Sequence, residues 1–255
     1  MADIKKGILA VLKELLLKQK TRKFHSAVIL AAGNGVRFGD ENGKHFVLVN
    51  DVPVVVRSVR AFEESPLIDE IIVVTREEDI GACEQLFREA KFTKVKSVIA
   101  GGADRQASAK NGFDAINPHA DFVSIHDAAR CLITPSVIAD VANEAYKHGA
   151  AVAAEKAVDT VKRADDKGFI TETMDRDYVW LAKTPQTFMA DMYRAAVYTA
   201  EKDGIRATDD CALAERLGFK IKLVDCGWEN IKITYPDDRA RAEHILKQRE
   251  DKEEV

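Results

Sequence analysis

The sequence predicts an α/β fold built on a mostly parallel, twisted sheet with helices on both faces. Segments that are apolar throughout alternate with amphipathic segments along most of the chain, and this alternation is typical of strands that are buried on both sides. The 255 residues, of which 46% are hydrophobic, suffice for one sizeable core. No internal repeat is visible, so a single domain is the simplest organisation.

Residues 1–25 stand apart as an extension. Lysines separate apolar residues that recur at helical spacing, namely Ile4, Ile8, Val11, Leu12 and Leu15. The pattern predicts an extra N-terminal amphipathic helix with a basic polar face. Three interpretations stay open: packing on its own domain or on a second subunit, contact with a membrane surface, or a tail without a role in the fold.

The α/β pattern then runs from residue 26 to residue 154. The expected strands lie at 26–32, 70–74, 95–100, 122–125 and 150–154. The expected helices between them lie at 53–62, 80–90 and 105–116, and a fourth lies between Thr134 and Gly149. The helix before the last strand has a clear start and end, because Thr134 is a good N-cap, Pro135 suits the first helical position and Gly149 closes the helix.

The rhythm breaks at about 157–180, where two strand-like runs, 158–163 and 169–173, flank a turn at 164–168. A hairpin inserted in an α/β domain cannot bury both of its faces alone, so we expect a protruding β-hairpin arm that packs on a partner subunit. The pattern resumes with a helix at 190–203, a helix capped by Thr208, strands at 221–225 and 231–234, and a final helix from Pro236. The domain thus covers 26–250, and 251–255 form a charged tail.

Composition excludes several classes of protein. A net charge of -4 argues against a nucleic-acid binder. The four cysteines are scattered without a Cys-x-x-Cys pair, which indicates neither a disulfide framework nor a zinc site and favours a cytoplasmic location. No apolar run approaches the roughly 20 residues of a membrane span, and no secretory signal is visible, so we expect no stable membrane insertion.

A glycine-rich loop, 31–39, follows the first strand, at the edge of the sheet where ligands bind in such folds. Phe38 stands where a dinucleotide loop would have its third glycine, and the nucleotide-hydrolase pattern fails at Phe38 and His45. The loop carries two cations, Arg37 and Lys44, with the spacing to flank one polyphosphate. The alternative is that both are solvated surface cations.

The loop pattern Ala31-Ala32-Gly33-x-Gly35-x-Arg37, with Lys44 two residues before Phe46, resembles the signature of cytidylyltransferases, and most closely the 2-C-methyl-D-erythritol 4-phosphate cytidylyltransferase family. The similarity continues in order along the chain through Gly101-Gly102-x-x-Arg105-x-x-Ser108, His126-Asp127-Ala128-Ala129-Arg130, Asp159–Arg163, Thr173–Arg176, Thr184-Pro185-Gln186, Thr208-Asp209-Asp210 and Asn230–Thr234. The resemblance implies a Rossmann-like fold and transfer of CMP from CTP to a polyol phosphate, with release of pyrophosphate.

The resemblance also implies roles for individual residues. Arg37 and Lys44 would stabilise the triphosphate and the transition state, and Arg176 and Lys232 would position the sugar phosphate for attack. The residues implied for CTP are Ala31, Ala32, Gly33, Gly35, Arg37, Lys44, Gly102, Arg105, Ser108, Asp127 and Ala128. Those implied for the second substrate are Asp127, Arg130, Thr160, Lys162, Arg176, Thr184, Gln186, Thr208 and Lys232.

Two further expectations follow from the same resemblance. Mg²⁺ would be the cofactor, bound mainly by the CTP phosphates and near Asp127. Because Arg176 lies just past the predicted arm, it would reach the site of the neighbouring subunit, which makes a homodimer with arm exchange part of the catalytic machinery. His126 is expected to be structural.

Alternatives to this function remain. The nearest is a cytidylyltransferase for another polyol phosphate such as ribitol 5-phosphate, which would share the nucleotide loop and differ in the second pocket. A non-catalytic nucleotide-binding module and a dinucleotide-dependent oxidoreductase are the alternatives of other classes. The sequence departs from the family pattern at Gly43, Ala103 and Cys131, but none of these removes a charge that the chemistry needs.

Overall fold

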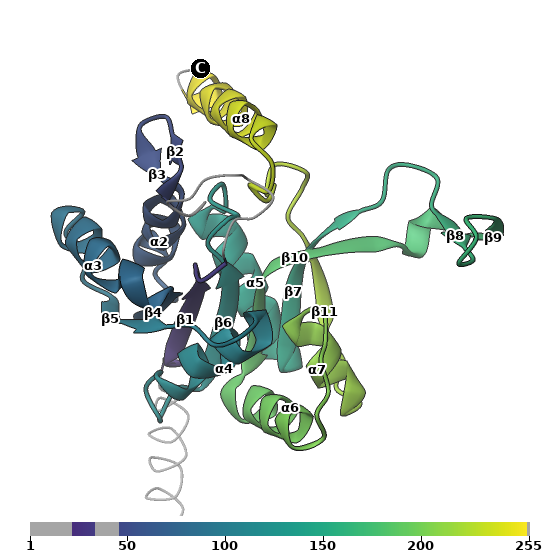
Figure 1. Ribbon diagram of the computed structural model, residues 1–255, viewed down its shortest axis with the longest axis horizontal. Helices are drawn as coiled ribbons and strands as arrows, with labels where there is room; N and C mark the ends of the chain where they lie inside the picture. Colours follow the sequence, from purple (N-terminus) through teal and green to yellow (C-terminus); the bar gives the residue numbers. More distant parts are fainter. Residues whose placement is uncertain (1–21, 34–45, 254–255) are drawn as a thin grey trace, which may run out of the picture.

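A seven-stranded sheet forms the centre of the computed structural model, which describes residues 22–33 and 46–253 (Figure 1). The strand order is β11-β7-β10-β6-β1-β4-β5. Neighbouring strands run parallel, except that β10 is antiparallel to both β6 and β7. The predicted mostly parallel sheet is therefore confirmed. Its strands are β1 (His25–Leu30), β4 (Glu70–Thr75), β5 (Val95–Ala100), β6 (Phe122–Asp127), β7 (Ala150–Lys156), β10 (Trp180–Met189) and β11 (Lys222–Asp225).

Helices cover both faces of the sheet, and β1 shows how the sequence divides between them. Successive side chains of a strand point to opposite faces, so Val28 and Leu30 join the core under α4, α6 and α7, while Ala27 and Ile29 join the core under α2 and α3. Each β1 residue is buried because both faces are covered. The helices are α2 (Val54–Glu64), α3 (Ile80–Glu89, preceded by the short η2, Glu77–Asp79), α4 (Arg105–Asp114), α5 (Pro135–His148), α6 (Ala190–Lys202) and α7 (Asp210–Arg216).

The last helix, α8 (Asp237–Glu253), lies beside a small hairpin of β2 (Leu48–Val49) and β3 (Val52–Pro53) at one end of the molecule (Figure 1). Ala242 and Ile245 of α8 pack there on Val49 and on Ile233. The segment leading into α8, from residue 226 to residue 236, is thereby held against the body of the domain.

Helix ends follow the predicted local chemistry with one correction. Thr134 accepts a hydrogen bond from the Val137 N–H at 3.4 Å, and Gly149 ends α5 in the left-handed region, as expected. The cap of α7 is Asp209, not Thr208, because the Asp209 carboxylate accepts from the Ala212 N–H at 3.0 Å. A carboxylate also interacts favourably with the helix dipole.

One predicted strand is wrong, and one strand of the central sheet was missed. Residues 231–234 were expected to form a strand, but they pair with no ladder: Ile233 N–H donates to the Ala129 carbonyl at 2.8 Å, and the buried Ile231 and Ile233 side chains hold the extended segment in place. Strand β10 was not predicted at all, since Pro185 interrupts it and proline within a run argues against a central strand. Its register shifts between Ala182 and Gln186, where that proline lies.

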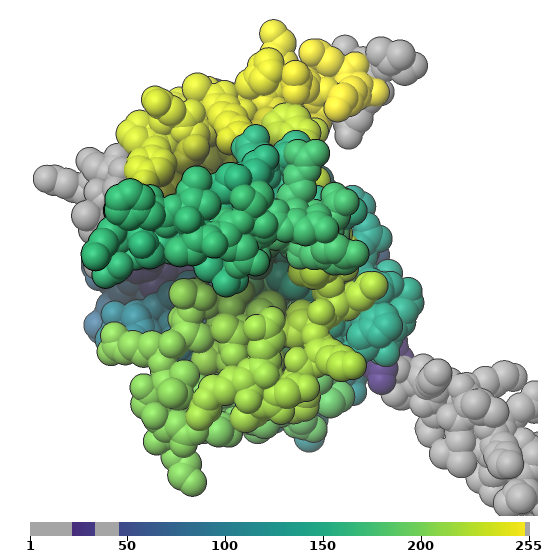
Figure 2. Space-filling view, turned by 90° about the vertical axis from the view of Figure 1, so that its right-hand side faces the viewer, coloured from purple at the N-terminus to yellow at the C-terminus, as the bar shows by residue number. Residues whose placement is uncertain are grey.

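The predicted arm is present as β8 (Lys162–Ala164) and β9 (Ile170–Thr173), followed by the short helix η3 (Arg176–Tyr178). The Asp165 carboxylate accepts from the Lys167 and Phe169 N–H groups and fixes the turn. The arm projects away from the sheet (Figure 1), and viewed end-on it stands between α8 above and α6 and α7 below (Figure 2). Large apolar side chains on and beside it are exposed, namely Val158, Phe169, Ile170, Tyr178 and Leu181.

Within the part of the chain that the structure describes, no helix combines the length and the apolar character needed to cross a membrane. The predicted N-terminal helix at 1–25 lies almost entirely outside the described residues, as do most of the glycine-rich loop and the end of the charged tail.

We expect Gly112→Ala to destabilise the protein by about 1–3 kcal/mol, because overpacking forces backbone shifts. A Cβ at Gly112 would lie 2.3 Å from Val28 Cγ1 and 2.8 Å from Val74 Cγ2, so α4 would have to move off the sheet. Gly81 in α3 is the matched control: a Cβ there meets nothing within 4 Å, and Gly81→Ala should stabilise the helix by roughly 0.5–1 kcal/mol. Urea unfolding of both variants measures this, and equal effects would contradict it.

A buried histidine gives a pH-dependent stability. Burial lowers the pKa of His25 from 6.5 to about 3, and its ring nitrogens contact Tyr146 Oη and Ser124 Oγ, both at 2.9 Å. Below pH 6.5 the unfolded chain binds a proton that folded His25 does not, so the free energy of unfolding decreases as the pH is lowered, with a limiting slope of about 1.4 kcal/mol per pH unit. We expect His25→Gln to make this fall shallower between pH 7 and pH 5, and exposed His119→Gln to leave it unchanged, in urea titrations. The same slope in all three proteins would rule out His25 as the source.

Candidate active site

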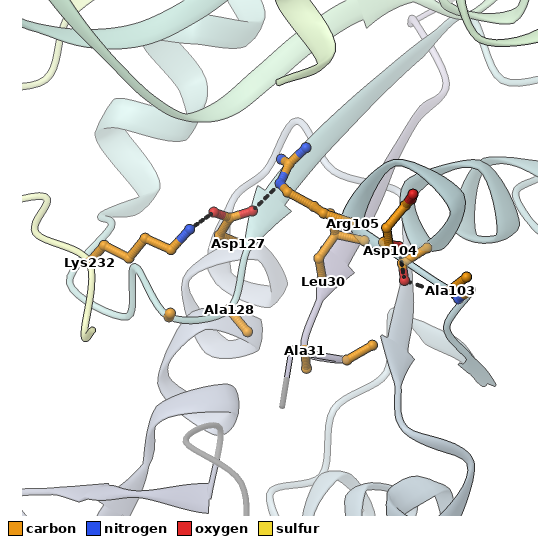
Figure 3. A pocket seen from close by; sticks show the side chains of 13 residues that line it. Leu30, Ala31, Ala103, Asp104, Arg105, Asp127, Ala128 and Lys232 are labelled. Atoms are coloured by element: carbon orange, nitrogen blue, oxygen red, sulfur yellow. Dashed lines mark hydrogen bonds and ion pairs between the residues drawn. The ribbon is translucent and has the colours of Figure 1, made fainter. Parts of the chain in front are cut away.

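A cavity of about 310 Å³ opens at the carboxyl ends of β1 and β6, beside the start of α4 (Figure 3). This is the edge where ligands bind in open α/β sheets, and its volume is in the range of small-molecule sites. The lining residues come from four segments: Leu30, Ala31, Ala32 and Gly33; Gly102, Ala103, Asp104, Arg105 and Ser108; Asp127, Ala128 and Ala129; and Lys232.

One wall of the cavity is a loop that the start of α4 holds tightly. Ser108 Oγ accepts from the Gly102 N–H at 3.0 Å and donates to the Asp104 carbonyl at 2.8 Å. The Asp104 carboxylate caps α4 by accepting from the Ala107 N–H. A Cβ at Gly102 would lie 2.5 Å from the Ala107 Cβ, so only glycine lets the loop approach the helix this closely. The predicted nucleotide residues Gly102 and Ser108 are thus parts of one hydrogen-bonded wall.

Asp127 lies between two cations at the opposite wall. Its Oδ1 accepts from Arg105 Nε at 3.0 Å and its Oδ2 accepts from Lys232 Nζ at 2.6 Å. In Figure 3 the two cationic side chains approach the carboxylate from opposite sides. Burial alone would raise the pKa of Asp127, but the charges of Arg105 and Lys232 outweigh it and hold that pKa well below its usual range. Asp127 is therefore ionised at neutral pH.

Arg105 also contacts a second carboxylate, since its Nη1 donates to Asp210 Oδ2 at 2.7 Å. Burial opposes the charge of Arg105, but Asp210 and Asp127 together raise its pKa above the ordinary range. Among the described residues, four charged groups, two of each sign, thus form a chain from Lys232 through Asp127 and Arg105 to Asp210.

The backbone under Asp127 is fixed by β10. Thr184 Oγ1 accepts from the Asp127 N–H at 3.1 Å and lies 3.0 Å from His126 Nδ1. His126 is fully buried against the Phe62 ring, and burial lowers its pKa to about 3. It is neutral and structural, as its sequence context indicated.

Lys232 is positioned by the buried Asn230. Asn230 Nδ2 donates to the Thr184 carbonyl at 3.0 Å, and the Asn230 carbonyl accepts from Arg130 Nη1 at 2.9 Å. Burial lowers the pKa of Arg130. Arg130 is thus engaged with the segment that carries Lys232 and does not line the cavity.

The remaining predicted site residues lie elsewhere in this chain. Thr160, Lys162 and Arg176 are exposed on or beside the arm, where Lys162 Nζ donates to Thr173 Oγ1 and Arg176 Nη1 to the Val158 carbonyl. Thr208 is exposed, while Gln186 is buried. The Gln186 side-chain amide forms hydrogen bonds within the protein: its oxygen accepts from the Asp210 and Cys211 N–H groups, and its nitrogen donates to the Asp209 carboxylate. Gly35, Arg37 and Lys44 lie outside the described residues.

Comparison with known proteins decides the family. The family model described as 2-C-methyl-D-erythritol 4-phosphate cytidylyltransferase matches residues 25–248. The chain belongs to this family. A relative of that name from Clostridium acetobutylicum is 40% identical over 222 residues, covering 87% of this chain and 96% of the relative. One from Geobacter metallireducens is 39% identical over 227 residues, covering 88% and 97%.

A solved structure agrees with this assignment. The crystal structure titled 4-diphosphocytidyl-2C-methyl-D-erythritol synthase from Anaerococcus prevotii has a TM-score of 0.80 and 30% sequence identity, and the match covers 88% of this chain and 96% of that one. This cytidylyltransferase therefore has the Rossmann-like nucleotidyltransferase fold, and the match excludes the oxidoreductase alternative.

Sequence reasoning missed several residues around the cavity of this cytidylyltransferase. Leu30, Ala103, Asp104 and Ala129 line it, and Asp210 holds Arg105. Asp104 had a usable signal, because it directly precedes a predicted helix and Asp is a preferred N-cap. Asp210 was named only as part of the Thr208-Asp209-Asp210 motif, and nothing in the sequence indicated its ion pair with Arg105, which is 105 residues away.

Proposed function

We propose that this chain transfers CMP from CTP to 2-C-methyl-D-erythritol 4-phosphate, giving the CDP-linked methylerythritol and pyrophosphate, a step of non-mevalonate isoprenoid synthesis. Family membership supports the reaction. The observation in the structure that carries the proposal is the cavity, where a glycine-containing backbone wall faces the Arg105–Asp127–Lys232 group. Such a site combines close backbone approach with two cationic side chains held in fixed positions, as a triphosphate requires.

The reaction needs positioning and charge more than proton transfer. A phosphate oxygen of the polyol forms a bond to the α-phosphorus while the bond from that phosphorus to the bridging oxygen breaks and pyrophosphate leaves. The attacking phosphate monoester is already anionic at neutral pH, so no general base is required. Lys232 and Arg105 supply positive charge near the reacting phosphates, and we expect Arg37 and Lys44 to add theirs from the glycine-rich loop.

The nucleotide base fits the uncharged part of the cavity. Ala31, Ala32 and Ala128 provide a small-residue surface there, and Gly102 with Ser108 provides the hydrogen-bonded wall. We propose that the backbone of this wall selects cytosine by its hydrogen-bonding edge. Gly33, where β1 runs into the glycine-rich loop, leads toward the triphosphate.

Mg²⁺ is the proposed cofactor, and the donor set fits an ion that the substrate brings. Within residues 22–33 and 46–253, no cluster of three or more His, Cys, Asp or Glu side chains is suited to holding a metal alone. Asp127 is an ionised carboxylate that lines the cavity, and Mg²⁺ usually binds through one or two carboxylates plus phosphates. When bound, the ion would neutralise charge on the phosphates.

Chelation with EDTA should abolish turnover, and excess Mg²⁺ should restore it.

The exposed apolar side chains of the arm support a homodimer in which the arms pack on the partner subunit. Thr160, Lys162 and Arg176 do not line this chain's cavity, which fits a role of Arg176 in the partner's site. We also propose a cytoplasmic location, which the four unpaired cysteines support.

The reaction is tested by incubating the protein with CTP, Mg²⁺ and either 2-C-methyl-D-erythritol 4-phosphate or ribitol 5-phosphate and measuring pyrophosphate release. We expect release with the methylerythritol phosphate and much less with ribitol phosphate. Release with ribitol phosphate alone would replace the proposed substrate, and release with neither would support a non-catalytic nucleotide-binding module.

Arm exchange is tested by subunit mixing. Arg176→Ala and Asp127→Asn should each be nearly inactive, but mixed dimers would contain one site with both native residues. We expect mixing after mild dissociation to recover activity that neither variant has alone, and mixing two batches of Asp127→Asn serves as the control. Mixed dimers without recovered activity would place Arg176 in the site of its own chain, and native activity of Arg176→Ala alone would place it outside catalysis.

A further inference from the structure

The carboxylate of Asp210 is buried deep behind the cavity, and Arg105 is the only cation with which it forms an ion pair among the described residues. Its side chain is 1% exposed, and it does not line the cavity. Burying a lone carboxylate is expensive unless it is paired and fully hydrogen-bonded. Asp210 is buried in spite of this cost, although it is not among the proposed substrate contacts. This indicates a function of the carboxylate other than packing.

Both oxygens of the Asp210 carboxylate are engaged. Oδ1 accepts from Tyr193 Oη at 2.6 Å, and Oδ2 accepts from Arg105 Nη1 at 2.7 Å. The backbone is fixed too, since the Asp210 N–H donates to Gln186 Oε1 at 3.0 Å. Tyr193 is itself packed between the rings of Phe113 and Phe188. The carboxylate is therefore a rigid anchor that belongs to the core.

The anchor determines how Arg105 presents its guanidinium. A guanidinium next to a single carboxylate prefers a bidentate pair, in which two N–H groups bind both oxygens. Here Asp210 holds Nη1, which excludes an end-on pair through Nη1 and Nη2, and Arg105 gives Asp127 only its Nε, at Oδ1. Asp127 Oδ2 is thereby left for Lys232.

We infer that Asp210 is a positioning residue for nucleotidyl transfer: it acts through Arg105 to keep Asp127 shared between Arg105 and Lys232, in the arrangement that receives the substrates. Asp210 also makes the number of negative and positive charges in this chain of four groups equal. Without its charge, Arg105 is free to take both Asp127 oxygens or to turn into the cavity. The inference rests on the proposed cytidylyl transfer for its kinetic consequences, but the arrangement itself is measurable without any substrate.

The first test is Asp210→Asn, which keeps the side-chain size and removes the charge. We expect kcat/KM for CTP to fall about 10- to 100-fold, the range seen when a supporting partner of a functional group is removed. Asp203→Asn is the matched control, because Asp203 forms a similar 2.6 Å pair with Arg216 outside the cavity. It should retain native kinetics.

A double-mutant cycle separates positioning from general structural damage. If Asp210 acts through Arg105, then Asp210→Asn should cost less than about threefold in kcat/KM in an Arg105→Lys background, because the two residues form one unit. Multiplicative losses, with the full Asp210→Asn effect retained in that background, would overturn the inference.

A substrate-free measurement distinguishes failure of this inference from failure of the proposed reaction. With ¹⁵N-labelled arginine, the Nε–H signal of Arg105, assigned by its loss in Arg105→Lys, should exchange slowly with water in the native protein. In Asp210→Asn it should shift and exchange faster. An unchanged signal would refute the positioning role even if CTP is turned over, whereas a lack of wild-type turnover counts against the proposed reaction alone.

Tyr193→Phe provides a second variant if Asp210→Asn does not fold. It preserves the charge of Asp210 and removes only the hydrogen bond at Oδ1. We expect a smaller change of the same kind, with faster exchange of the Arg105 Nε–H and a severalfold lower kcat/KM. No change in either quantity would show that the anchor is dispensable.

Discussion

The Asp127→Asn variant is expected to lose about two or more orders of magnitude in turnover, comparable to removal of a preorganised electrostatic group from an active site. The native carboxylate takes one hydrogen bond from each of two cations, at 3.0 Å from Arg105 and 2.6 Å from Lys232. An amide has one acceptor oxygen and no charge, so the two cations would repel one another and leave their positions. Pyrophosphate release at saturating substrates measures the effect.

The control for this experiment is Asp114→Asn, which removes a carboxylate from the far end of α4. Asp114 pairs with Lys110 at 2.8 Å and accepts from Tyr198 Oη, away from the cavity. Its turnover should stay within about twofold of the native value, since exposed ion pairs contribute little. Near-native turnover in Asp127→Asn, with the native melting temperature retained, would remove Asp127 from the mechanism.

The largest loss of stability is expected for Phe188→Ala, at about 3–5 kcal/mol, the usual cost of deleting a buried aromatic ring. Phe188 is fully buried on β10, its ring stacks on Tyr193 at 5.2 Å between centroids, and it belongs to the core that joins α4, α6 and α7 to the sheet. Deleting the ring leaves a cavity under α6. This helix carries Tyr193, which donates a hydrogen bond to Asp210. We therefore expect reduced affinity for CTP as well.

Urea denaturation measures this loss, with Tyr235→Ala as the control. Tyr235 is 55% exposed, so its truncation should change the free energy of unfolding by less than about 0.5 kcal/mol. Similar losses of unfolding free energy in the two variants would mean that the core rearranges to fill the space left by the Phe188 ring. The packing argument would then be wrong.

The fold was accessible from sequence because its signals are local. Buried strands such as Glu70–Thr75 contain a continuous apolar run, Ile71–Val74, and α5 begins and ends with capping residues that can be recognised one by one. The arm was accessible for the same reason, as a turn between two strand-like runs. What failed was non-local: β10 is a strand because β6 and β7 flank it, and nothing in its own residues outweighs Pro185.

The candidate site shows the same division. The segments that meet at the cavity follow predicted strands or open a predicted helix, in agreement with the rule for ligand sites in such sheets, and Gly102, Arg105 and Asp127 could be assigned to one nucleotide site from the family resemblance. The ion pairs could not. Asp127 was expected near phosphates, and its simultaneous contacts to Arg105 and Lys232 depend on a chain reversal 105 residues later. The roles of Arg37, Lys44 and Arg176 stay predictions.

Strand β10 connects two parts of the molecule that the sequence keeps separate. Its first residues, Trp180–Ala182, pair with the end of β7 at the base of the arm, and Thr184, two residues on, holds the Asp127 backbone. A displacement imposed on the arm is thus transmitted along one covalent segment to the carboxylate between the two cations. The base of the arm and the support of the Asp127 backbone therefore belong to one strand, so a substitution that loosens β10 at the base of the arm would also loosen the candidate active site.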